Sequence, residues 1–461
     1  MMDANIFKKY DIRGNAEGDE AVVTAEAARW IGLGFGTHIQ RNSHVDQVVV
    51  GRDNRRSSFN LARAAMDGLR ASGCKVIDIE LVSTPIVYWQ AVRYGNIAGM
   101  MITGSHLTPE QNGFKLCVGS KNLFGSQLQA IRNFIESGDL TYGAGTLTAD
   151  RSAYSKYVED LTARVQMMRP LKIVIDAGNG TAGLFAPRLF KAWGHEVLEC
   201  LFCQPDGNFP NHPANPQEAV NMTALGQRVR DLGADIGIAF DGDADRMGVV
   251  NEKGEMIAAD RILALLARDM LKRNPGATVV ADVLTSQALF DEVQRCGGNG
   301  VMWASGHSLV KAKMAETGAL LGGEMSGHIF LGENYHGYDD GFLAAGRLLQ
   351  VLADTDQPLS ALDDSVPRFY STPEYRPHCP DADKRIVIDG VQRALIGNGT
   401  LSTVDGVRVQ FEAGWGLLRA SNTEPVLSLR FEGRTEVDAM AYRALFAEAL
   451  KGYPQVGALE A

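Results

Sequence analysis

A short apolar strand that leads into an amphipathic helix recurs three times along the chain, at intervals of more than 100 residues. The three strands are predicted at "VVVGRD" (48–53), "LKIVIDAGNG" (171–180) and "ATVVADVL" (277–284). A strand that ends in a polar loop and is followed by a helix is the building unit of parallel α/β sheets. The interval is too long for a solenoid. The pattern therefore predicts three related α/β domains.

The C-terminal part of the chain has a different pattern. A chain of 461 residues is too long for one hydrophobic core, so two to four domains are expected. After a predicted linker, "TPEYRPHCPD" (372–381), strands and helices mix and indicate a smaller α+β domain. We expect the domains to cover four ranges, 1–148, 149–252, 253–365 and 370–461.

Composition limits what the chain can bind. A formal net charge of −10 leaves no surplus of cations for non-specific binding to nucleic acids or membranes, so neither partner is expected. The N-terminus lacks an apolar signal core and no run of about 18 apolar residues occurs, so a cytoplasmic location is expected. Of the cysteines, only Cys200 and Cys203 have a C-x-x-C spacing, so we expect reduced thiols and no zinc ribbon.

Each α/β unit also contains a later strand that ends in a glycine-rich polar loop. These segments are "GMMITGSH" (99–106), "IGIAFDGDADR" (236–246) and "ALLGGEMSGH" (319–328). Ligands of open α/β sheets bind beyond the carboxyl ends of the strands, so the three loops are expected to line one cleft. On the first loop, Ser105 is either a turn residue or a nucleophile, and its own loop does not decide between them.

The segment "DGDADR" places Asp241, Asp243 and Asp245 at alternate positions after an apolar strand. In a curled loop, three carboxylates can converge on a hard cation. An EF-hand loop also begins with alternating aspartates, but Arg246 stands where that loop needs glycine. A solvated acidic turn is the other alternative. We favour a magnesium site, since Mg²⁺ usually keeps open positions for phosphate oxygens.

Two further loops carry groups that suit a sugar phosphate. In "RASNTEP" (419–425), a guanidinium and several neutral donors suit a phosphate dianion, although a turn closed by Ser and Asn side chains is an alternative. In "GEMSGH" (323–328), a carboxylate and a hydroxyl suit sugar hydroxyls. Other polar candidates on nearby motifs are Tyr10, Arg13, Lys115 and His307.

Taken in order, five motifs resemble the α-D-phosphohexomutase family, in particular its bacterial phosphomannomutase/phosphoglucomutase branch. They are "KYDIRG" (9–14), "TGSH…NGFK" (103–115), "DGDADR", "GEMSGH" and "GWGLLRASNTEPVLSLRFE" (414–432), and they span nearly the whole chain. The resemblance implies three topologically related α/β domains and a smaller C-terminal α+β domain, arranged in a heart shape around a central cleft.

The resemblance also implies an activity, the reversible transfer of a phosphoryl group between the 1- and 6-positions of glucose and mannose phosphates. Ser105 would carry the phosphoryl group, and a hexose 1,6-bisphosphate would be the intermediate. One Mg²⁺ per chain would bind Ser105, Asp241, Asp243 and Asp245, and glucose 1,6-bisphosphate would prime the enzyme. Hexose phosphates are the expected partners, and a monomer or weak dimer is the expected state.

The resemblance assigns roles to the other motif residues. The catalytic residues that it implies are Ser105, His106, Lys115, Arg246 and Arg13. The substrate-binding residues that it implies are Tyr10, His307, Glu324, Ser326, His328, Arg419, Ser421, Asn422 and Thr423. Lys115 is also a candidate general acid or base.

Two departures from the family pattern stand out. Leu107 and Thr108 follow Ser105 and His106 where the family usually has Asn-Pro, which changes the turn chemistry of the serine loop. Leu284 stands where the nearest relatives carry a lysine, so one substrate contact is expected to be missing. Neither departure touches the serine or the three aspartates.

Three alternative functions compete with this interpretation. A phosphoglucosamine mutase, the nearest rival, usually has glutamine at the position of Met325. A serine hydrolase would need a hydroxyl-to-imidazole geometry that neighbours such as Ser105 and His106 rarely give, and "TGSHL" is not the G-x-S-x-G elbow. An inactive sugar-phosphate-binding protein would not need the serine and the three aspartates.

Overall fold

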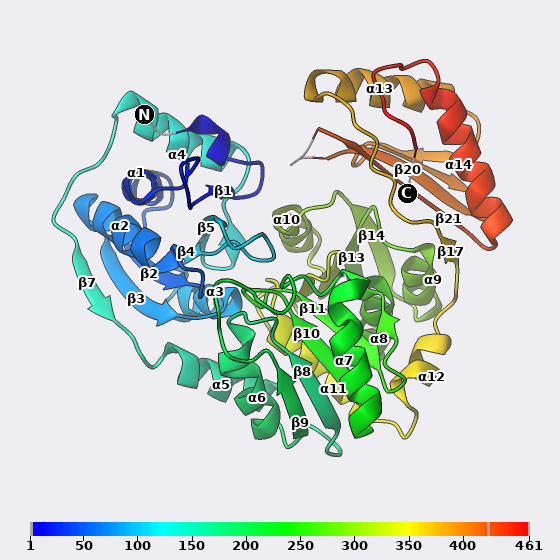
Figure 1. Cartoon of the computed structure of the whole chain (residues 1–461), viewed down its shortest axis with the longest axis horizontal. Coiled ribbons are helices and arrows are strands. Elements are labelled where there is room, and N and C mark those ends of the chain that lie inside the picture. Colours follow the sequence, from blue (N-terminus) through cyan, green and yellow to red (C-terminus); the bar gives the residue numbers. More distant parts are fainter. Residues whose placement is uncertain (1–2, 422–424, 460–461) are drawn as a thin grey trace.

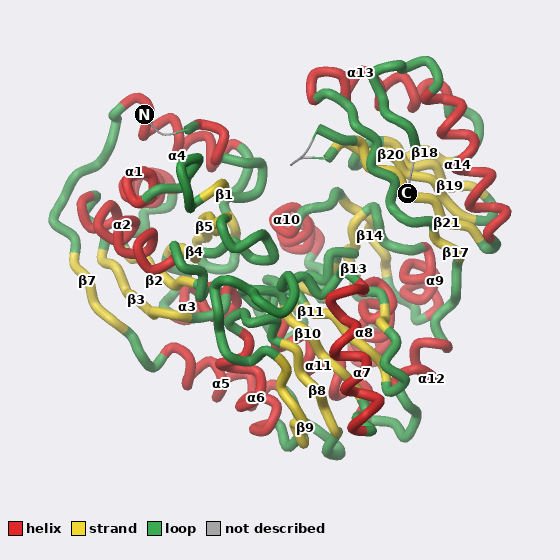
Figure 2. The backbone as a smooth tube through the Cα atoms, viewed as in Figure 1, coloured by secondary structure: helices red, strands yellow, loops and turns green. Residues whose placement is uncertain are grey.

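The computed structural model describes residues 3–421 and 425–459. These residues form four sheets with helices packed on them, and the four domains surround a central gap in a heart-like outline (Figure 1). The first and fourth domains face each other across the gap, and the second and third domains join them (Figure 2). The arrangement confirms the predicted fold class.

The first domain shows the strand order that the next two domains repeat. Its central strands are β2 (Gln47–Arg52), β3 (Lys75–Leu81), β4 (Ala98–Ile102) and β5 (Gln111–Val118). Strand β2 pairs in parallel with β3 on one side and with β4 on the other, and β5 returns antiparallel to β4. The sheet is completed by β1 (Ile12–Asn15), β6 (Lys121–Asn122) and β7 (Thr146–Ala149).

The second and third domains have the same order of parallel strands and the same antiparallel return. The strands of the second are β8 (Lys172–Asp176), β9 (Glu196–Leu201), β10 (Ile236–Phe240), β11 (Met247–Asn251) and β12 (Met256–Ile257). Those of the third are β13 (Thr278–Asp282), β14 (Asn299–Trp303), β15 (Leu321–Gly323) and β16 (Ile329–Leu331). Here β10 and β15 take the place of β4, and β11 and β16 take the place of β5.

The helices predicted after the three opening strands are confirmed as α2 (Ser58–Ala71), α6 (Ala182–Ala192) and α9 (Gln287–Arg295). In α2, Leu61, Ala65 and Leu69 recur every fourth residue and are all buried, as in an amphipathic helix that packs by one face. The other α-helices of these domains are α1 (Ala25–Asn42), α3 (Thr84–Arg93), α4 (Ser126–Ser137), α5 (Ala153–Arg164), α7 (Thr223–Leu232), α8 (Ala259–Arg273), α10 (His307–Thr317), α11 (Gly341–Ala353) and α12 (Leu359–Asp364).

The repeated strand order puts the three glycine-rich loops at equivalent positions. Each loop joins a parallel strand to the antiparallel strand that returns beside it, at β4–β5, β10–β11 and β15–β16. The second and third loops touch directly, because Arg246 forms a β-bridge with His328 and the Met247 N–H donates to Gly327 O over 3.3 Å. The three loops therefore meet where the domains converge.

One buried core runs through the first three domains. Aromatic side chains join them: Trp89 of the first domain lies edge-on to Tyr157, with ring centroids 5.7 Å apart, and Phe240 of the second lies 5.1 Å from Phe342 of the third. A continuous apolar core resists relative motion because separating its parts would expose apolar surface to water. These domains therefore form one rigid support for the loops.

The fourth domain has a separate core. Its strands are β17 (Tyr370–Ser371), β18 (Thr400–Ser402), β19 (Val407–Phe411), β20 (Gly414–Ala420) and β21 (Leu427–Gly433), and its helices are α13 (Asp381–Ala394) and α14 (Glu436–Leu450). Phe431 and Phe446 pack edge to face in that core. The segment predicted as a linker belongs partly to this sheet, because Tyr375 and His378 form bridges with Leu429 and Val426 of its edge.

The fourth domain joins the third through a small patch around the end of β13. Val283, Trp415 and Leu417 form a buried apolar cluster, and Leu284 packs against it. The buried Arg408 stacks its guanidinium 3.9 Å from the Trp415 ring and donates to Val283 O over 2.7 Å. Leu284, one of the two departures from the family pattern, thus contributes apolar contact at this junction.

The structure corrects one expectation about the cysteines. Cys200, at the end of β9, and Cys203 form a disulfide across Cα atoms 5.7 Å apart, a separation typical of such bridges, so not all thiols are free. Cys74, Cys117, Cys296 and Cys379 remain free thiols. Across the part of the chain that the structure describes, no helix has the length and apolarity needed to cross a membrane.

We expect Trp415→Ala to destabilise the fourth domain by about 3–5 kcal/mol, because the variant removes a fully buried indole and leaves a cavity at the junction. Differential scanning calorimetry of the full chain should then show a transition for the fourth domain at lower temperature, with the transition of the other three unchanged. Trp30→Ala, at a half-exposed indole on α1, is the control. A single transition that moves as a unit would contradict the separate core.

Candidate active site

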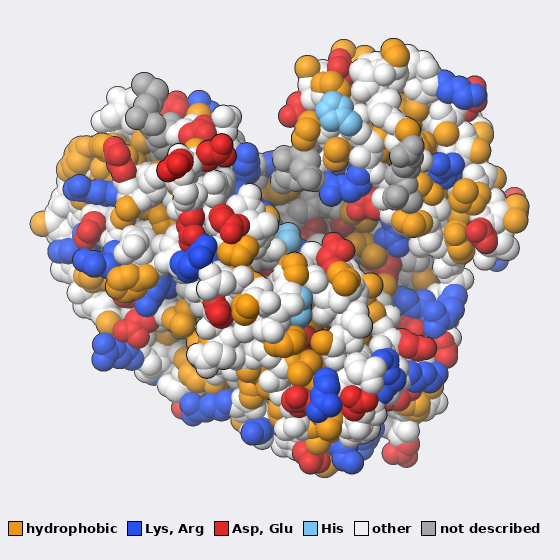
Figure 3. Space-filling model, viewed as in Figure 1, with side chains coloured by type: hydrophobic (Ala, Val, Ile, Leu, Met, Phe, Trp, Pro, Cys, Tyr) orange, Lys and Arg blue, Asp and Glu red, His pale blue; other side chains and the backbone are white. Residues whose placement is uncertain are grey.

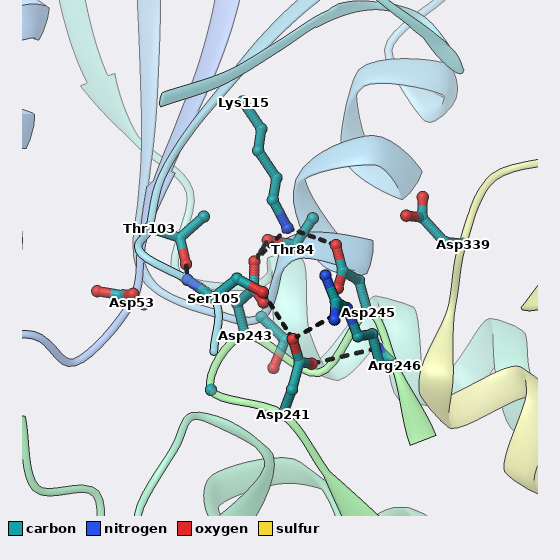
Figure 4. A network of polar contacts seen from close by, with 12 residues as sticks. Asp53, Thr84, Thr103, Ser105, Lys115, Asp241, Asp243, Asp245, Arg246 and Asp339 are labelled. Atoms are coloured by element: carbon teal, nitrogen blue, oxygen red, sulfur yellow. Dashed lines mark hydrogen bonds and ion pairs between the residues drawn. The ribbon is translucent and has the colours of Figure 1, made fainter. Parts of the chain in front are cut away.

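Ser105 lies on the loop between β4 and β5 and points toward the aspartate loop of the second domain (Figure 4). Its φ of 49° is in the left-handed region, which non-glycine residues adopt rarely and mostly at functional sites. The Ser105 N–H donates to Thr103 Oγ1 over 2.8 Å, and the Ser105 hydroxyl donates to Asp241 Oδ2 over 2.7 Å. The unusual backbone thus aims the hydroxyl at the carboxylates.

Asp241, Asp243 and Asp245 are fully buried, and one oxygen of each lies within 4.8 Å of the others. Asp243 Oδ1 and Asp245 Oδ1 have no hydrogen-bond partner among the described residues. Burial, together with the neighbouring charges of Asp243 and Asp245, raises the pKa of Asp241 well above its usual value. Converging, unpartnered oxygens of this kind suit a hard cation such as Mg²⁺, so the residues fit the metal site that the sequence predicts.

Lys115, on β5, is the nearest cation to these carboxylates. Its Nζ lies 2.7 Å from Asp243 Oδ2 and also contacts Asp245 Oδ2. Burial lowers the pKa of Lys115, but the carboxylates of Asp243 and Asp245 outweigh it and raise the pKa above its usual value. Lys115 is therefore an ammonium ion here, a state that suits charge neutralisation and proton donation rather than proton abstraction.

Arg246 connects the aspartate loop to the loop of the third domain. Its backbone N–H donates to Asp241 Oδ1 over 3.2 Å, and its Nε donates to His328 Nε2 over 3.0 Å. Because Nε2 accepts, the proton of a neutral His328 is on Nδ1, which lies 3.0 Å from Asp339 Oδ2. Asp339 thus orients His328, and His328 orients the guanidinium.

His106 and Arg13 lie on the first-domain side of the site. His106 Nδ1 is 3.3 Å from the Ser105 hydroxyl, and the nearby Arg246, with burial, lowers the pKa of His106 well below its usual value. Arg13, on β1, donates from Nε to Asp11 Oδ1 over 2.7 Å. Arg13, His106 and Arg246 together line a cavity of about 700 Å³. Two guanidinium groups at one cavity suit an anionic ligand.

The predicted sugar-binding residues of the third domain also lie together. Glu324 accepts from the Gly306 N–H over 2.6 Å, directly before His307 at the start of α10. The His307 ring stacks on His328 with centroids 5.4 Å apart. Tyr10 reaches across from the first domain, and its hydroxyl donates to Ser305 O over 3.0 Å. Ser326 is half-buried on the same tight loop as Glu324.

The predicted phosphate loop belongs to the fourth domain, on the other side of the gap. Arg419, on β20, donates from Nε to Asp405 Oδ2 over 2.8 Å, and the same carboxylate oxygen accepts from the Ser305 N–H over 3.3 Å. Ser421 O accepts from Lys384 over 2.8 Å. Asn422 and Thr423 lie outside the described residues. Figure 3 shows a hollow between the two upper lobes, with Lys, Arg and His side chains along it.

Sequence reasoning missed several residues that the structure brings to the site. Thr84, at the start of α3, donates its hydroxyl to Asp243 Oδ2 over 2.5 Å, and Asp339 pairs with His328. The buried Arg55 binds the backbone of the serine loop. "STP" (83–85) signals a helix start and "GRDNRR" (51–56) a strand end, but neither motif indicates a partner far along the chain.

Comparison with known families agrees with this geometry. Profiles of phosphoglucomutase/phosphomannomutase α/β/α domains I, II and III match residues 4–141, 155–254 and 258–369, and the profile of the C-terminal domain matches residues 378–449. The chain belongs to the phosphoglucomutase/phosphomannomutase family. The domain limits expected from the sequence differ slightly from these ranges and stay a prediction.

Individual members of the phosphoglucomutase/phosphomannomutase family match over the full length. A phosphomannomutase/phosphoglucomutase of Pseudomonas aeruginosa is 43% identical, over 98% of this chain and 96% of its own. A phosphoglucomutase of Neisseria gonorrhoeae is 39% identical, over 98% of both chains. A crystal structure of a phosphoglucomutase/phosphomannomutase family protein from Burkholderia thailandensis covers all of both chains, with a TM-score of 0.93 and 40% identity.

Glu324 makes the stability of the fold depend on pH. Burial, and next the neighbouring Asp282, raise the pKa of Glu324 from its usual 4.5 to about 8. Between these values the folded state keeps a proton that the unfolded state releases, so stability falls as pH rises through this window. Glu324→Gln removes the titrating group, so its stability relative to wild type should increase from pH 5 to pH 8.

Urea unfolding at a series of pH values measures this difference. Glu159→Gln, at an exposed position on α5, controls for the loss of one carboxylate. A stability difference between Glu324→Gln and wild type that stays constant from pH 5 to pH 8 would count against a buried, protonated Glu324.

Proposed function

We propose that this member of the family is a phosphoglucomutase/phosphomannomutase that moves a phosphoryl group between the 1- and 6-positions of glucose and mannose phosphates. The observation that carries the proposal is the Ser105 hydroxyl, which donates to Asp241 in a buried cluster of three aspartates. A phosphorylated Ser105 would stand beside cations that neutralise the transferred group. The full-length similarity to relatives that bear both names supports the proposal.

In the first transfer, a sugar hydroxyl oxygen forms a bond to phosphorus while the bond from phosphorus to Ser105 Oγ breaks, and the proton of that hydroxyl ends on Ser105 Oγ. In the second, Ser105 Oγ forms the bond to phosphorus while the bond from phosphorus to the other sugar oxygen breaks, and the serine proton ends on that sugar oxygen. Lys115 and Arg246 stabilise the charge of the transferred group, and the ammonium of Lys115 can supply a proton to the departing oxygen and be restored by the proton of the attacking hydroxyl. The enzyme returns to its starting state.

Ser105, Asp241, Asp243 and Asp245 would hold one Mg²⁺, which supplies charge neutralisation at the phosphoryl oxygens when bound. His106 and Arg13 support the serine side of the site. His106 Nδ1 lies near the serine hydroxyl, and because its lowered pKa favours the neutral ring, it adds no positive charge that would compete with a metal cation for the aspartates.

The substrate is held from two sides of the gap. We assign the sugar hydroxyls to Glu324 and Ser326, with His307, His328 and Tyr10 beside them. The phosphate that does not react would bind the fourth-domain residues, which are Arg419, Ser421, Asn422 and Thr423. A bisphosphate must turn end for end to present both phosphates to Ser105, and the separate core of the fourth domain would allow this domain to open and close.

The alternatives are less well supported. A phosphoglucosamine mutase usually has glutamine where this chain has Met325. For a serine hydrolase, the Ser105 hydroxyl would have to donate to a histidine, but its shorter bond, 2.7 Å, is to Asp241 Oδ2, whereas His106 Nδ1 lies 3.3 Å away. An inactive binding protein would give no reason for a strained serine beside three aspartates. A cytoplasmic location and a monomer or weak dimer are also part of the proposal.

Ser105→Ala should remove turnover almost completely and leave substrate affinity nearly unchanged, because Ser105 carries the phosphoryl group and other loops bind the sugar. The test is a coupled assay with glucose 1-phosphate and mannose 1-phosphate, with the phosphate on Ser105 measured by intact mass. Dephosphorylated wild type should lag, and glucose 1,6-bisphosphate should abolish the lag. Turnover near the wild-type rate in Ser105→Ala would exclude the phosphoserine mechanism.

Removal of the metal should also abolish turnover, because the three buried carboxylates and a phosphoserine repel one another without a divalent cation. The experiment is dialysis against EDTA, verification of the metal content, and titration with MgCl₂ while turnover is followed. We expect activity to return at about one Mg²⁺ per chain, a stoichiometry consistent with a single carboxylate cluster. Full activity in a verified metal-free sample would mean that the cluster has another role.

A further inference from the structure

A fully buried arginine lies under the serine loop. The guanidinium of Arg55 donates from Nη2 to Ser105 O over 2.8 Å and to Leu107 O over 2.7 Å. From Nη1 it donates to Thr108 O and, over 3.1 Å, to Gln111 O. One side chain thus binds four carbonyls of a single loop. A planar fork of five donors can do this, whereas a lysine cannot.

Asp53 fixes the orientation of this guanidinium. Asp53 Oδ2 lies 3.2 Å from Arg55 Nε and accepts from the Gly104 N–H over 3.2 Å. Asp53 Oδ1 accepts from the Arg55 N–H over 3.0 Å and from the Ser58 hydroxyl. Figure 4 shows Asp53 beside the loop that carries Thr103 and Ser105. Arg55 Nε has this ion pair and no hydrogen bond among the described residues. The hydrogen bonds of Asp53 and of the two Nη atoms hold the pair in place, because breaking any of them leaves a buried group unsatisfied.

The second domain also contacts Arg55. The ring of Phe209 lies 4.9 Å from the Arg55 guanidinium. A Cβ on Gly207 would clash with Asn54 O and the Arg56 N–H, so the second-domain backbone approaches the first-domain backbone closely here. A Cβ on Gly242, inside the aspartate loop, would clash with Ser105 O, one of the carbonyls that Arg55 binds. The arginine therefore sits where both loops are fixed relative to each other.

The sequence of the serine loop explains why its backbone needs to be held by Arg55. Ser105 has a left-handed backbone, which costs free energy unless its surroundings enforce it. Positions 107 and 108 carry leucine and threonine, and neither has a ring that restricts φ as proline does. The carbonyls of these two residues are among the four that Arg55 binds.

We propose that Arg55 is a positioning residue that holds Ser105 in its left-handed conformation and, with Phe209, in line with Asp241. Its guanidinium binds backbone carbonyls of the loop and not the serine hydroxyl. Its removal should slow phosphoryl transfer to and from Ser105 without weakening the binding of the sugar. The inference rests on the proposed mutase function, because only a transfer at Ser105 would be sensitive to this alignment.

The test compares Arg55→Ala and Arg55→Lys with wild type. Two rates are measured: turnover of glucose 1-phosphate, and phosphate uptake on Ser105 from glucose 1,6-bisphosphate, followed by intact mass. A displacement of about 1 Å can cost about 100-fold in rate, so we expect Arg55→Ala to lose about 100-fold in both kcat and phosphate uptake. KM should change by less than about threefold, since the binding of the sugar phosphate itself is unaffected.

Chemical rescue separates positioning from general loss of structure. Guanidinium chloride at a non-denaturing concentration should raise the kcat of Arg55→Ala by at least about tenfold, because the free ion can bind the four carbonyls in place of the lost side chain. The same salt should leave Arg63→Ala unchanged. Arg63 is an exposed residue on α2 whose guanidinium lies 5.9 Å from the Phe59 ring, and it serves as the matched control.

Several results would overturn the proposal. One is a folded Arg55→Ala enzyme with kcat within about threefold of wild type, and another is a loss that falls on KM rather than on kcat. If Arg55→Ala does not fold, Arg55→Lys is the deciding variant, because it keeps the buried positive charge but not the planar guanidinium. A wild-type rate in Arg55→Lys would exclude the positioning role of the guanidinium. If wild-type Ser105 took up no phosphate from glucose 1,6-bisphosphate, the result would instead count against the mutase function itself.

Discussion

The site depends on the balance of charge around three fully buried aspartates. Carboxylates this close repel one another strongly in a low-dielectric interior, so each needs a partner that is fixed in place. Lys115 supplies one ammonium to Asp243 and Asp245, Thr84 adds a hydroxyl to Asp243, and the Ser105 hydroxyl bonds to Asp241. These partners come from the first domain, whereas the aspartates belong to the second. The electrostatics of the cluster thus join the two domains at the point where chemistry is proposed.

The fold meets this demand by repeating one topology three times. In each α/β domain, a parallel strand is followed by an antiparallel strand that pairs with it, and the loop between the two strands carries the polar residues. A shared apolar core keeps the three turns together, so the serine, the aspartates and the proposed sugar-binding residues lie close to one another. The fourth domain has its own core and joins the third through a small apolar patch and polar contacts, such as the bond from the Ser305 N–H to Asp405. Three domains with a shared core are therefore combined with a fourth domain that has a core of its own.

Local patterns allowed much of this to be predicted. The three opening strands and their helices follow from apolar runs and amphipathic spacing, and the aspartate and serine loops follow from composition and from order along the chain. Two predictions were wrong, and a distant partner explains the first of them. Residues expected in a linker pair with the edge of the fourth sheet, through Tyr375 and Leu429. Cys200 and Cys203, expected as thiols, are bonded to each other.

By itself, the sequence determined which loops carry the chemistry, because hydrophobic periodicity and residue type act over a few neighbouring positions. Only the tertiary structure decided how those loops are held. Arg55 reaches carbonyls about fifty positions away, and Asp339 orients His328, which in turn binds Arg246 of another domain. No local pattern encodes such partners, because a buried polar group can be satisfied by any segment that the fold brings near. The packing of the three domains determines which distant residues become partners.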